Sequence, residues 1–92
     1  MHRFRIDATL DPQSLPRIAG FFAQRAMVPT TLRMRRLRQH MRVDVAVAGL
    51  TAAQATVIAA KLGEMFVVIA VELVARHRVG HPGEGRDLAA AA

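Results

Sequence analysis

The sequence contains no cysteine, tryptophan or tyrosine, and only one lysine among its 92 residues. Without cysteine there can be no disulfide, no thiolate metal site and no thiol nucleophile. The longest apolar runs, residues 45–50 and 65–71, are far shorter than the ~20 residues of a membrane-spanning helix. A secretory signal would show a basic segment followed by an apolar one, and this pattern is not found near residue 1. We therefore expect a cytoplasmic protein with no membrane segment.

The charge of the chain is one-sided. Thirteen basic residues, twelve of them arginine, oppose seven acidic ones, for a formal net charge of +6. Such an excess can attract a nucleic acid or an acidic protein, or can reflect only the base composition of a genome. A chain of this length forms one domain and buries only about 60–65% of its unfolded surface. We expect its stability to be modest or to depend on a partner.

Hydrophobic periodicity predicts six elements, because alternation with period two indicates strands and spacing of three to four indicates amphipathic helices. They are, in order, a strand at 2–9, a helix at 11–26, strands at 28–38 and 41–48, a helix at 51–62 and a strand at 65–74. The last strand is apolar on both parities, which is typical of a strand covered on both faces. The order βαββαβ with right-handed crossovers predicts a ferredoxin-like α+β fold, with a four-stranded antiparallel sheet and both helices on one face.

Sequence signals also mark the ends of the two helices. Asp11, or alternatively Ser14, is a plausible N-cap of the first helix. Thr51 and Gln54 have the spacing of a capping box at the start of the second helix. Gly63 follows the last periodic residue of that helix, where a left-handed C-cap belongs.

Residues 76–92 differ in character from the rest of the chain. The segment RHRVGHPGEGRDLAAAA contains three glycines and a proline and has no apolar period. We therefore expect a single domain over residues 1–75, followed by a disordered tail over residues 76–92.

The open face of the sheet is where function is expected, and its residues exclude several activities. RNA-recognition modules stack bases on aromatic residues of the central strands, but Phe4 shares the parity of Ile6 and is expected in the core. No Ser–His–Asp arrangement, carboxylate pair, Gly-rich phosphate loop or metal-ligand spacing stands out. We expect no catalytic residue, no metal and no cofactor. The first and third strands offer no aromatic side chain to the open face, and the charged side chains that they offer there are Arg3, Arg5, Asp7, Arg42 and Asp44.

The strongest remaining signal is a run of arginines in the second predicted strand and the hairpin after it. Its members are Arg33, Arg35, Arg36, Arg38 and Arg42. One interpretation is a solvated edge strand whose charges prevent edge-to-edge aggregation. The other is a docking surface, for an acidic protein in preference to a nucleic acid.

Residues 10–26, LDPQSLPRIAGFFAQRA, resemble the first loop and helix of an ACT domain. In that family a strand leads into a loop similar to D-x-P-G-x-L, followed by R-I/V, two apolar residues and Q-R-G. The variety that looks most similar is the small regulatory subunit of acetolactate synthase (acetohydroxyacid synthase), from branched-chain amino-acid biosynthesis. The resemblance spans about residues 3–74.

The resemblance implies a non-catalytic subunit with the βαββαβ fold. It further implies a homodimer with a continuous sheet and, in many members, an amino-acid effector bound at the dimer interface. In regulatory subunits it implies docking onto, and activation of, the acetolactate synthase catalytic subunit, which carries the chemistry. The arginine run would then contact that enzyme.

The family's effector site corresponds to a small set of residues in this chain. They are Asp11, Gln13 and Ser14 in the loop, with Val28 and Thr30 contributed across the dimer interface. The alternative interpretation of the loop is simple helix capping. Gln13 and Ala26 stand where the family has glycine, which makes the chain similar to the short, feedback-insensitive small subunits.

Two other functions remain open at this point. One is a free-standing ACT protein that senses an amino acid without an enzyme partner. The other is a basic nucleic-acid-binding module, which the lack of aromatic residues on the open face disfavours.

Overall fold

Alternating side chains in two central strands organise the structure, a computed structural model in which residues 1–74 are described. Strand β1 (His2–Ala8) pairs antiparallel with β3 (Met41–Val47), so that Phe4 lies opposite Val45. Both of these side chains are buried. Because neighbours along a strand point to opposite faces, the pairing makes one face of the sheet apolar and the other charged.

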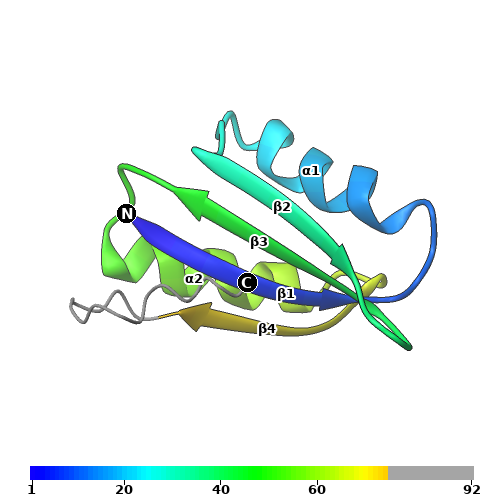
Figure 1. Ribbon diagram of the computed structural model, residues 1–92. Coiled ribbons are helices and arrows are strands. Elements are labelled where there is room, and N and C mark those ends of the chain that lie inside the picture. Colours follow the sequence, from blue (N-terminus) through cyan, green and yellow to red (C-terminus); the bar gives the residue numbers. More distant parts are fainter. Residues whose placement is uncertain (75–92) are drawn as a thin grey trace.

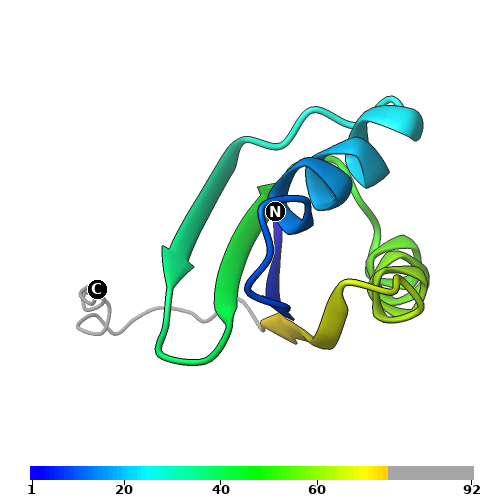
Figure 2. The ribbon, with the colours of Figure 1, turned by 90° about the vertical axis from the view of Figure 1, so that its right-hand side faces the viewer.

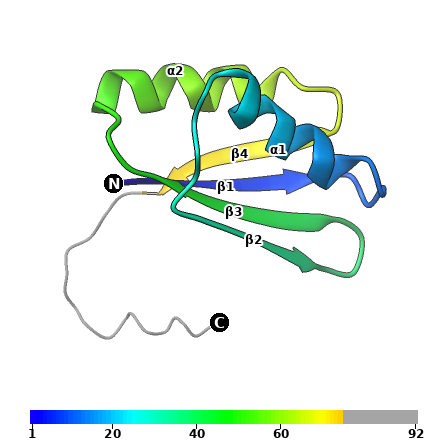
Figure 3. The ribbon, with the colours of Figure 1, turned by 90° about the horizontal axis from the view of Figure 1, so that it is seen from above.

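The remaining elements complete the expected βαββαβ order (Figure 1). Strands β2 (Thr31–Arg36) and β4 (Val68–Val74) form the two edges of an antiparallel sheet with the order β2-β3-β1-β4, which can be followed in Figure 3. Helices α1 (Ser14–Gln24) and α2 (Ala52–Gly63) lie on the same side of it (Figure 2). The predicted ferredoxin-like fold is confirmed.

The core lies between this sheet and the helices. Helix α1 contributes Ile18 and Phe22, and α2 contributes Ala55 and Leu62, all fully buried. The ring of Phe22 packs on that of Phe4 with 6.1 Å between centroids and 56° between planes, within the range that aromatic pairs favour. The predicted burial of Phe4 is therefore confirmed.

The start of α1 differs from both predictions. Its N-cap is Gln13, whose side chain makes no capping bond, so neither Asp11 nor Ser14 is the cap. A carboxylate oxygen of Asp11 instead accepts the N–H of Gln13 at 2.7 Å, which is the local turn that Asp favours. Because Asp11 closes this turn two residues on, the helix begins three residues later than the predicted residue 11.

Helix α1 ends in a Schellman motif built on an alanine. Ala26 has φ of 59°, and its N–H donates to the carbonyl of Ala23 at 3.0 Å, while the N–H of Met27 donates to that of Phe22 at 2.9 Å. Glycine usually occupies this left-handed position, because a Cβ there is sterically costly. The motif keeps its hydrogen bonds here at the cost of backbone strain at Ala26.

The capping box predicted for α2 is present, and the predicted C-cap is wrong. The hydroxyl of Thr51 accepts the N–H of Gln54 at 3.0 Å, and the Gln54 side chain accepts the N–H of Thr51 at 2.9 Å. Gly63 is the last helical residue, and the helix is capped by Glu64 with a right-handed φ of −85°. The helix runs one residue further than predicted, so no left-handed residue is needed at Gly63.

The last strand is also shorter and less covered than predicted. Residues 65–67 form a turn before β4, and within residues 1–74 β4 lies at the sheet edge with β1 as its one neighbour. The apolar residues on both parities belong to this turn and to an exposed edge strand, in which Ile69 is 59% exposed. They do not indicate a strand that is covered on both faces. The arginine-rich strand β2 is likewise confined to residues 31–36 of the predicted 28–38.

The predicted tail, residues 76–92, lies outside the described residues. Among residues 1–74, no helix is long and apolar enough to cross a membrane.

We predict opposite effects for two Ala→Gly substitutions at the end of α1. Ala26→Gly should raise the free energy of unfolding by about 1 kcal/mol, because glycine tolerates the left-handed backbone. Ala23→Gly, at an exposed helical position three residues earlier, should lower it by roughly 0.5–1 kcal/mol. Urea unfolding of both variants measures the difference, and equal signs would contradict the strain assigned to Ala26.

Candidate functional site

A broad groove of about 750 Å³ lies where the β1–α1 loop meets the turn before β4. This volume falls within the range of small-molecule sites. Two of the predicted effector residues, Asp11 and Gln13, line it. Its other lining residues include Thr9, Arg17, Phe21, Arg25, Met65 and Phe66.

The family's loop glycine is not required by the backbone of this groove. Gln13 replaces it with φ of −83° and ψ of −14°, in the ordinary right-handed region. A side chain at this position therefore costs no conformational strain. The replacement changes only what fills the groove.

Ser14, the third predicted loop residue, is held away from solvent. It is fully buried, and its hydroxyl donates to the carbonyl of Thr9 at 2.8 Å and lies 3.1 Å from the Thr9 hydroxyl. A buried hydroxyl needs such partners, because an unsatisfied one costs about 1–3 kcal/mol. Ser14 therefore ties the loop to the end of β1 and does not line the groove.

The structure does not bring Val28 and Thr30 to the loop within one chain. The N–H of Thr30 donates to the carbonyl of Ala46 at 2.7 Å, and Ala46 pairs with Arg3 near the start of β1. The loop follows Ala8, at the opposite end of the same strand. Only a second copy could place the 87% exposed Val28 beside a loop groove.

The open face of the sheet carries a row of alternating charges that crosses all four strands. Arg33 of β2 lies opposite Asp44 of β3, which lies opposite Arg5 of β1, which lies opposite Glu72 of β4. The Nε of Arg5 donates to the Asp44 carboxylate at 3.4 Å. Opposite charges on directly facing residues stabilise a sheet, so this row helps to specify the strand register.

Asp7 forms the tightest polar contacts on this face. Its carboxylate accepts a hydrogen bond from Arg42 Nε at 2.9 Å and lies 3.2 Å from His40 Nε2. Partial burial acts to raise the pKa of Asp7, but the hydrogen bonds and charges of Arg42 and His40 outweigh it. The pKa of Asp7 is therefore lowered.

The predicted arginine run is divided among different surfaces. By the strand register, Arg33 and Arg35 project from the open face, while Arg36 is on the same parity as Leu32, Met34 and the core residues of β3. Arg38 lies in the exposed hairpin, and Arg42 is engaged by Asp7. The arginines are clustered in the sequence only, because side chains along β2 alternate between the two faces of the sheet.

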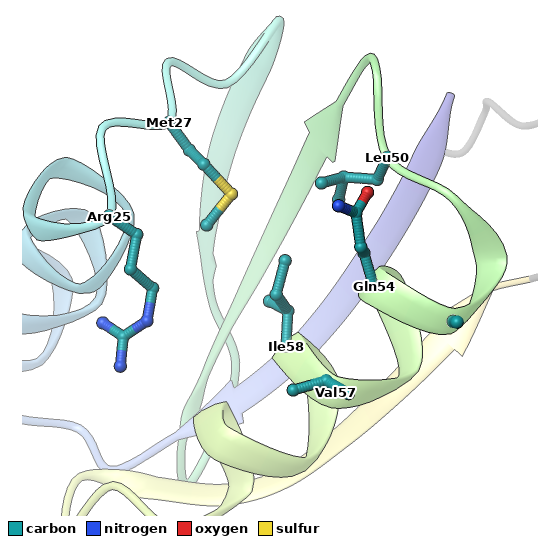
Figure 4. A pocket seen from close by; sticks show the side chains of 7 residues that line it. Arg25, Met27, Leu50, Gln54, Val57 and Ile58 are labelled. Carbon is teal, nitrogen blue, oxygen red and sulfur yellow. The ribbon is translucent and has the colours of Figure 1, made fainter.

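A second, apolar groove of about 510 Å³ lies between the two helices and has no counterpart in the sequence predictions (Figure 4). Met27, Leu50 and Ile58 line it beside the 53% exposed Val57. At its rim, the Arg25 guanidinium lies 3.7 Å from the centre of the Phe21 ring and donates to the Phe21 carbonyl at 3.0 Å. The signal that could have indicated it is Val57, an apolar residue outside the inward stripe of its helix.

Among residues 1–74, no group of three or more histidine, aspartate or glutamate residues is placed to hold a metal ion.

We predict that the stabilising effect of Asp7 depends on pH. A lowered pKa means that ionised Asp7 stabilises the folded chain above its unfolded pKa of about 3.8 and that this stabilisation is lost as the pH falls through the folded value. Asp7→Asn should lower the free energy of unfolding by up to about 1 kcal/mol at pH 7. The difference from the unsubstituted chain should shrink below about pH 4, as measured by urea unfolding at both pH values.

Asp44→Asn is the matched control for this experiment. Its carboxylate is 41% exposed and makes one longer contact, so the substitution should have a smaller effect at pH 7. A pH-independent effect of Asp7→Asn would contradict the role assigned to the ionised carboxylate.

Comparison with known proteins agrees with this architecture. Residues 1–79 match the model of a family described as the ACT-like domain. No curated protein matches the sequence significantly.

Solved structures give the same fold. The ACT domain from the GTP pyrophosphokinase of Chlorobium tepidum is similar in its crystal structure, with a TM-score of 0.68 and 15% identity over 79% of this chain and 95% of that one. Its solution structure gives a TM-score of 0.72, with 15% identity over 88% and 92%. The C-terminal domain of the MgtC protein from Mycobacterium tuberculosis gives 0.58, with 17% identity over 82% and 85%.

ACT domains are regulatory domains that bind small molecules and carry no catalytic groups. Because the family match covers most of its length, the chain belongs to the ACT-like domain family.

Proposed function

We propose that this ACT-like domain binds an amino-acid effector in the β1–α1 groove and regulates an enzyme to which it docks. The observation that carries the proposal is the lining of that groove. It combines a carboxylate, two guanidinium groups and apolar side chains within one cavity of suitable size.

This lining matches the chemistry of a free amino acid. The ammonium group of the effector would pair with the carboxylate of Asp11. The carboxylate of the effector would pair with the guanidinium of Arg17, because a planar guanidinium favours bidentate contacts with a carboxylate. Arg25 also lines the groove, but its guanidinium is engaged with Phe21. Arg17 is therefore the proposed carboxylate ligand.

The apolar part of the groove would hold the side chain of the effector. Phe21, Met65 and Phe66 line this part, and Phe66 is 99% exposed in the isolated chain. Covering an exposed aromatic ring removes apolar surface from water and favours binding by about 25 cal/mol per Å². An apolar or aromatic amino acid is therefore the proposed effector class.

The proposed enzyme partner is the acetolactate synthase catalytic subunit, and the support for it is the resemblance of residues 10–26. The acidic surface of that partner would contact Arg33, Arg35 and Arg38, while Arg36 lies on the other parity of β2 and Arg42 holds Asp7 in place. Regulation requires that the docked domain binds two conformations of the enzyme with different affinity. We further propose that two copies of the chain form the regulatory unit. The cytoplasmic location of the protein stays a prediction.

Calorimetry with the twenty amino acids tests effector binding. We expect heat of binding for an apolar or aromatic amino acid at millimolar concentration. Arg17→Gln should weaken that binding at least tenfold, because the effector carboxylate loses its charged partner. Arg33→Gln, which removes the same charge from β2 outside the groove, should leave it unchanged.

Absence of heat for all twenty amino acids would contradict effector binding. Equal losses in the Arg17→Gln and Arg33→Gln variants would contradict the assignment of the groove, because they would indicate a general effect of net charge.

Co-expression with the acetolactate synthase catalytic subunit of the same genome tests the partner. We expect the two chains to co-purify and the turnover of the enzyme to rise. Arg33→Glu combined with Arg35→Glu should release the enzyme at lower salt, because the exposed arginines no longer attract its acidic surface.

The two proposals fail separately. Amino-acid binding without co-purification or activation would contradict the acetolactate synthase assignment and would favour a free-standing amino-acid sensor. Co-purification without amino-acid binding would match the feedback-insensitive type of small subunit and would contradict the effector site.

A further inference from the structure

The groove between the two helices, here called the helix groove, is separate from the proposed effector groove at the β1–α1 loop, the loop groove. It has a volume of about 510 Å³, which lies within the range of small-molecule sites. Figure 4 shows Met27, after α1, and Ile58, on α2, pointing into this space from opposite sides. Leu50 and the 53% exposed Val57 extend the apolar lining. A ligand that covers these side chains removes apolar surface from water, which favours binding.

Arg25 is the one charged residue in the lining of the helix groove, among the residues that the structure describes. Its guanidinium lies 3.7 Å from the centre of the Phe21 ring, and its Nη1 donates to the Phe21 carbonyl at 3.0 Å. These contacts hold the group in place but supply no negative charge, and no ion pair within residues 1–74 includes Arg25. Arg25 can therefore bind the carboxylate of a ligand through its other N–H groups, in the planar geometry that guanidinium and carboxylate groups share.

The polar lining of the two grooves differs in a way that decides the ligand. Asp11 lines the loop groove, whereas no acidic residue of the described chain lines the helix groove. The side-chain carbonyl of Gln54 in the helix groove already accepts the N–H of Thr51 at 2.9 Å, in the capping box of α2. An ammonium group bound there would lose its water without gaining a charged partner, which is costly. The helix groove therefore disfavours free amino acids.

We propose that the helix groove is a second ligand site, for a carboxylic acid that has an apolar body and no amino group. Arg25 pairs with the carboxylate of this ligand, and the apolar body lies on Met27, Leu50 and Ile58. The site does not rest on the effector proposed above, because the loop groove and the helix groove select for different head groups.

The size of the helix groove limits the length of the ligand. The lining residues of α2 begin at Ala53 and end at Ile58, which is a rise of about 7.5 Å along the helix. A short- or medium-chain acid such as hexanoate covers this length, whereas the end of a longer chain extends into solvent. Each methylene that lies on the apolar lining should tighten binding about two- to fourfold, since complete burial of one corresponds to about fourfold.

Calorimetry of the full chain with butanoate, hexanoate, octanoate and decanoate tests the site. We expect the dissociation constant to fall at least about fourfold from butanoate to hexanoate. It should change less than about twofold from octanoate to decanoate, because the added methylenes stay in water. Norleucine, which has the chain of hexanoate and an added amino group, should not displace hexanoate.

Methionine methyl groups report which groove is occupied, because Met27 lines the helix groove and Met65 lines the loop groove. In methyl NMR spectra, hexanoate should shift the Met27 signal and leave the Met65 signal in place. A shift of the Met65 signal alone would place the carboxylic acid in the loop groove and would overturn the proposal.

Two variants test the contacts of the ligand, each with a control that changes the net charge equally. Arg25→Gln should weaken hexanoate binding at least tenfold, because the carboxylate loses its charged partner. Arg33→Gln on β2 should leave it within about twofold. Val57→Glu, which adds a negative charge inside the groove, should also weaken it at least tenfold, whereas Ala60→Glu, at an exposed residue of α2 outside the groove, should not. Circular dichroism checks that all four variants are folded.

The other outcomes overturn the proposal. Absence of binding for all four acids at millimolar concentration contradicts the site itself. An affinity that does not depend on chain length contradicts the apolar contacts, and displacement of hexanoate by norleucine contradicts the selection against an amino group. Equal losses in the variants and their controls would indicate general attraction to a positively charged chain. Failure of amino-acid binding in the loop groove would contradict the effector site and leave this second site standing.

Discussion

The structure depends on the alternation of apolar and charged residues along β1 and β3. Phe4 and Ile6 face the helices, while Arg5 and Asp7 face the other way. A slip of one residue would bury two charges and expose two large apolar side chains, so the register of the central pair is strongly specified. The position of both helices follows, because only one face of the sheet is apolar.

The same alternation divides the surface of the domain into regions with different chemistry. The loop groove lies at one end of the strands, and the arginines of β2 lie along one edge. The opposite edge, β4, is apolar apart from Glu72. Under the proposed function, the loop groove would bind the effector and the arginines of β2 would contact the enzyme, so these two roles would use separate regions of the surface.

Gln13 and Ala26 stand where the resemblance to the ACT family places glycine, and replacing glycine has a different physical cost at each position. Gln13 lies in the right-handed region, so its side chain changes the groove but does not strain the backbone. Ala26 has φ of 59°, so its Cβ does strain the backbone. The resemblance alone places glycine at both positions and cannot distinguish these cases, because the φ of each residue is set by the local hydrogen bonds at its own end of α1.

The sequence by itself determined the order of elements, the inward parity of each central strand and the capping box of α2, because these are set by neighbours within a few residues. It did not determine where α1 begins, because Asp11 and Ser14 have similar capping propensity, and in the structure neither is the cap: Asp11 accepts the N–H of Gln13, and Ser14 bonds to Thr9. The contact of Arg42 with Asp7, the exposed edge at β4 and the groove between the helices required the tertiary structure. These features join residues far apart in the chain, and only folding brings them together.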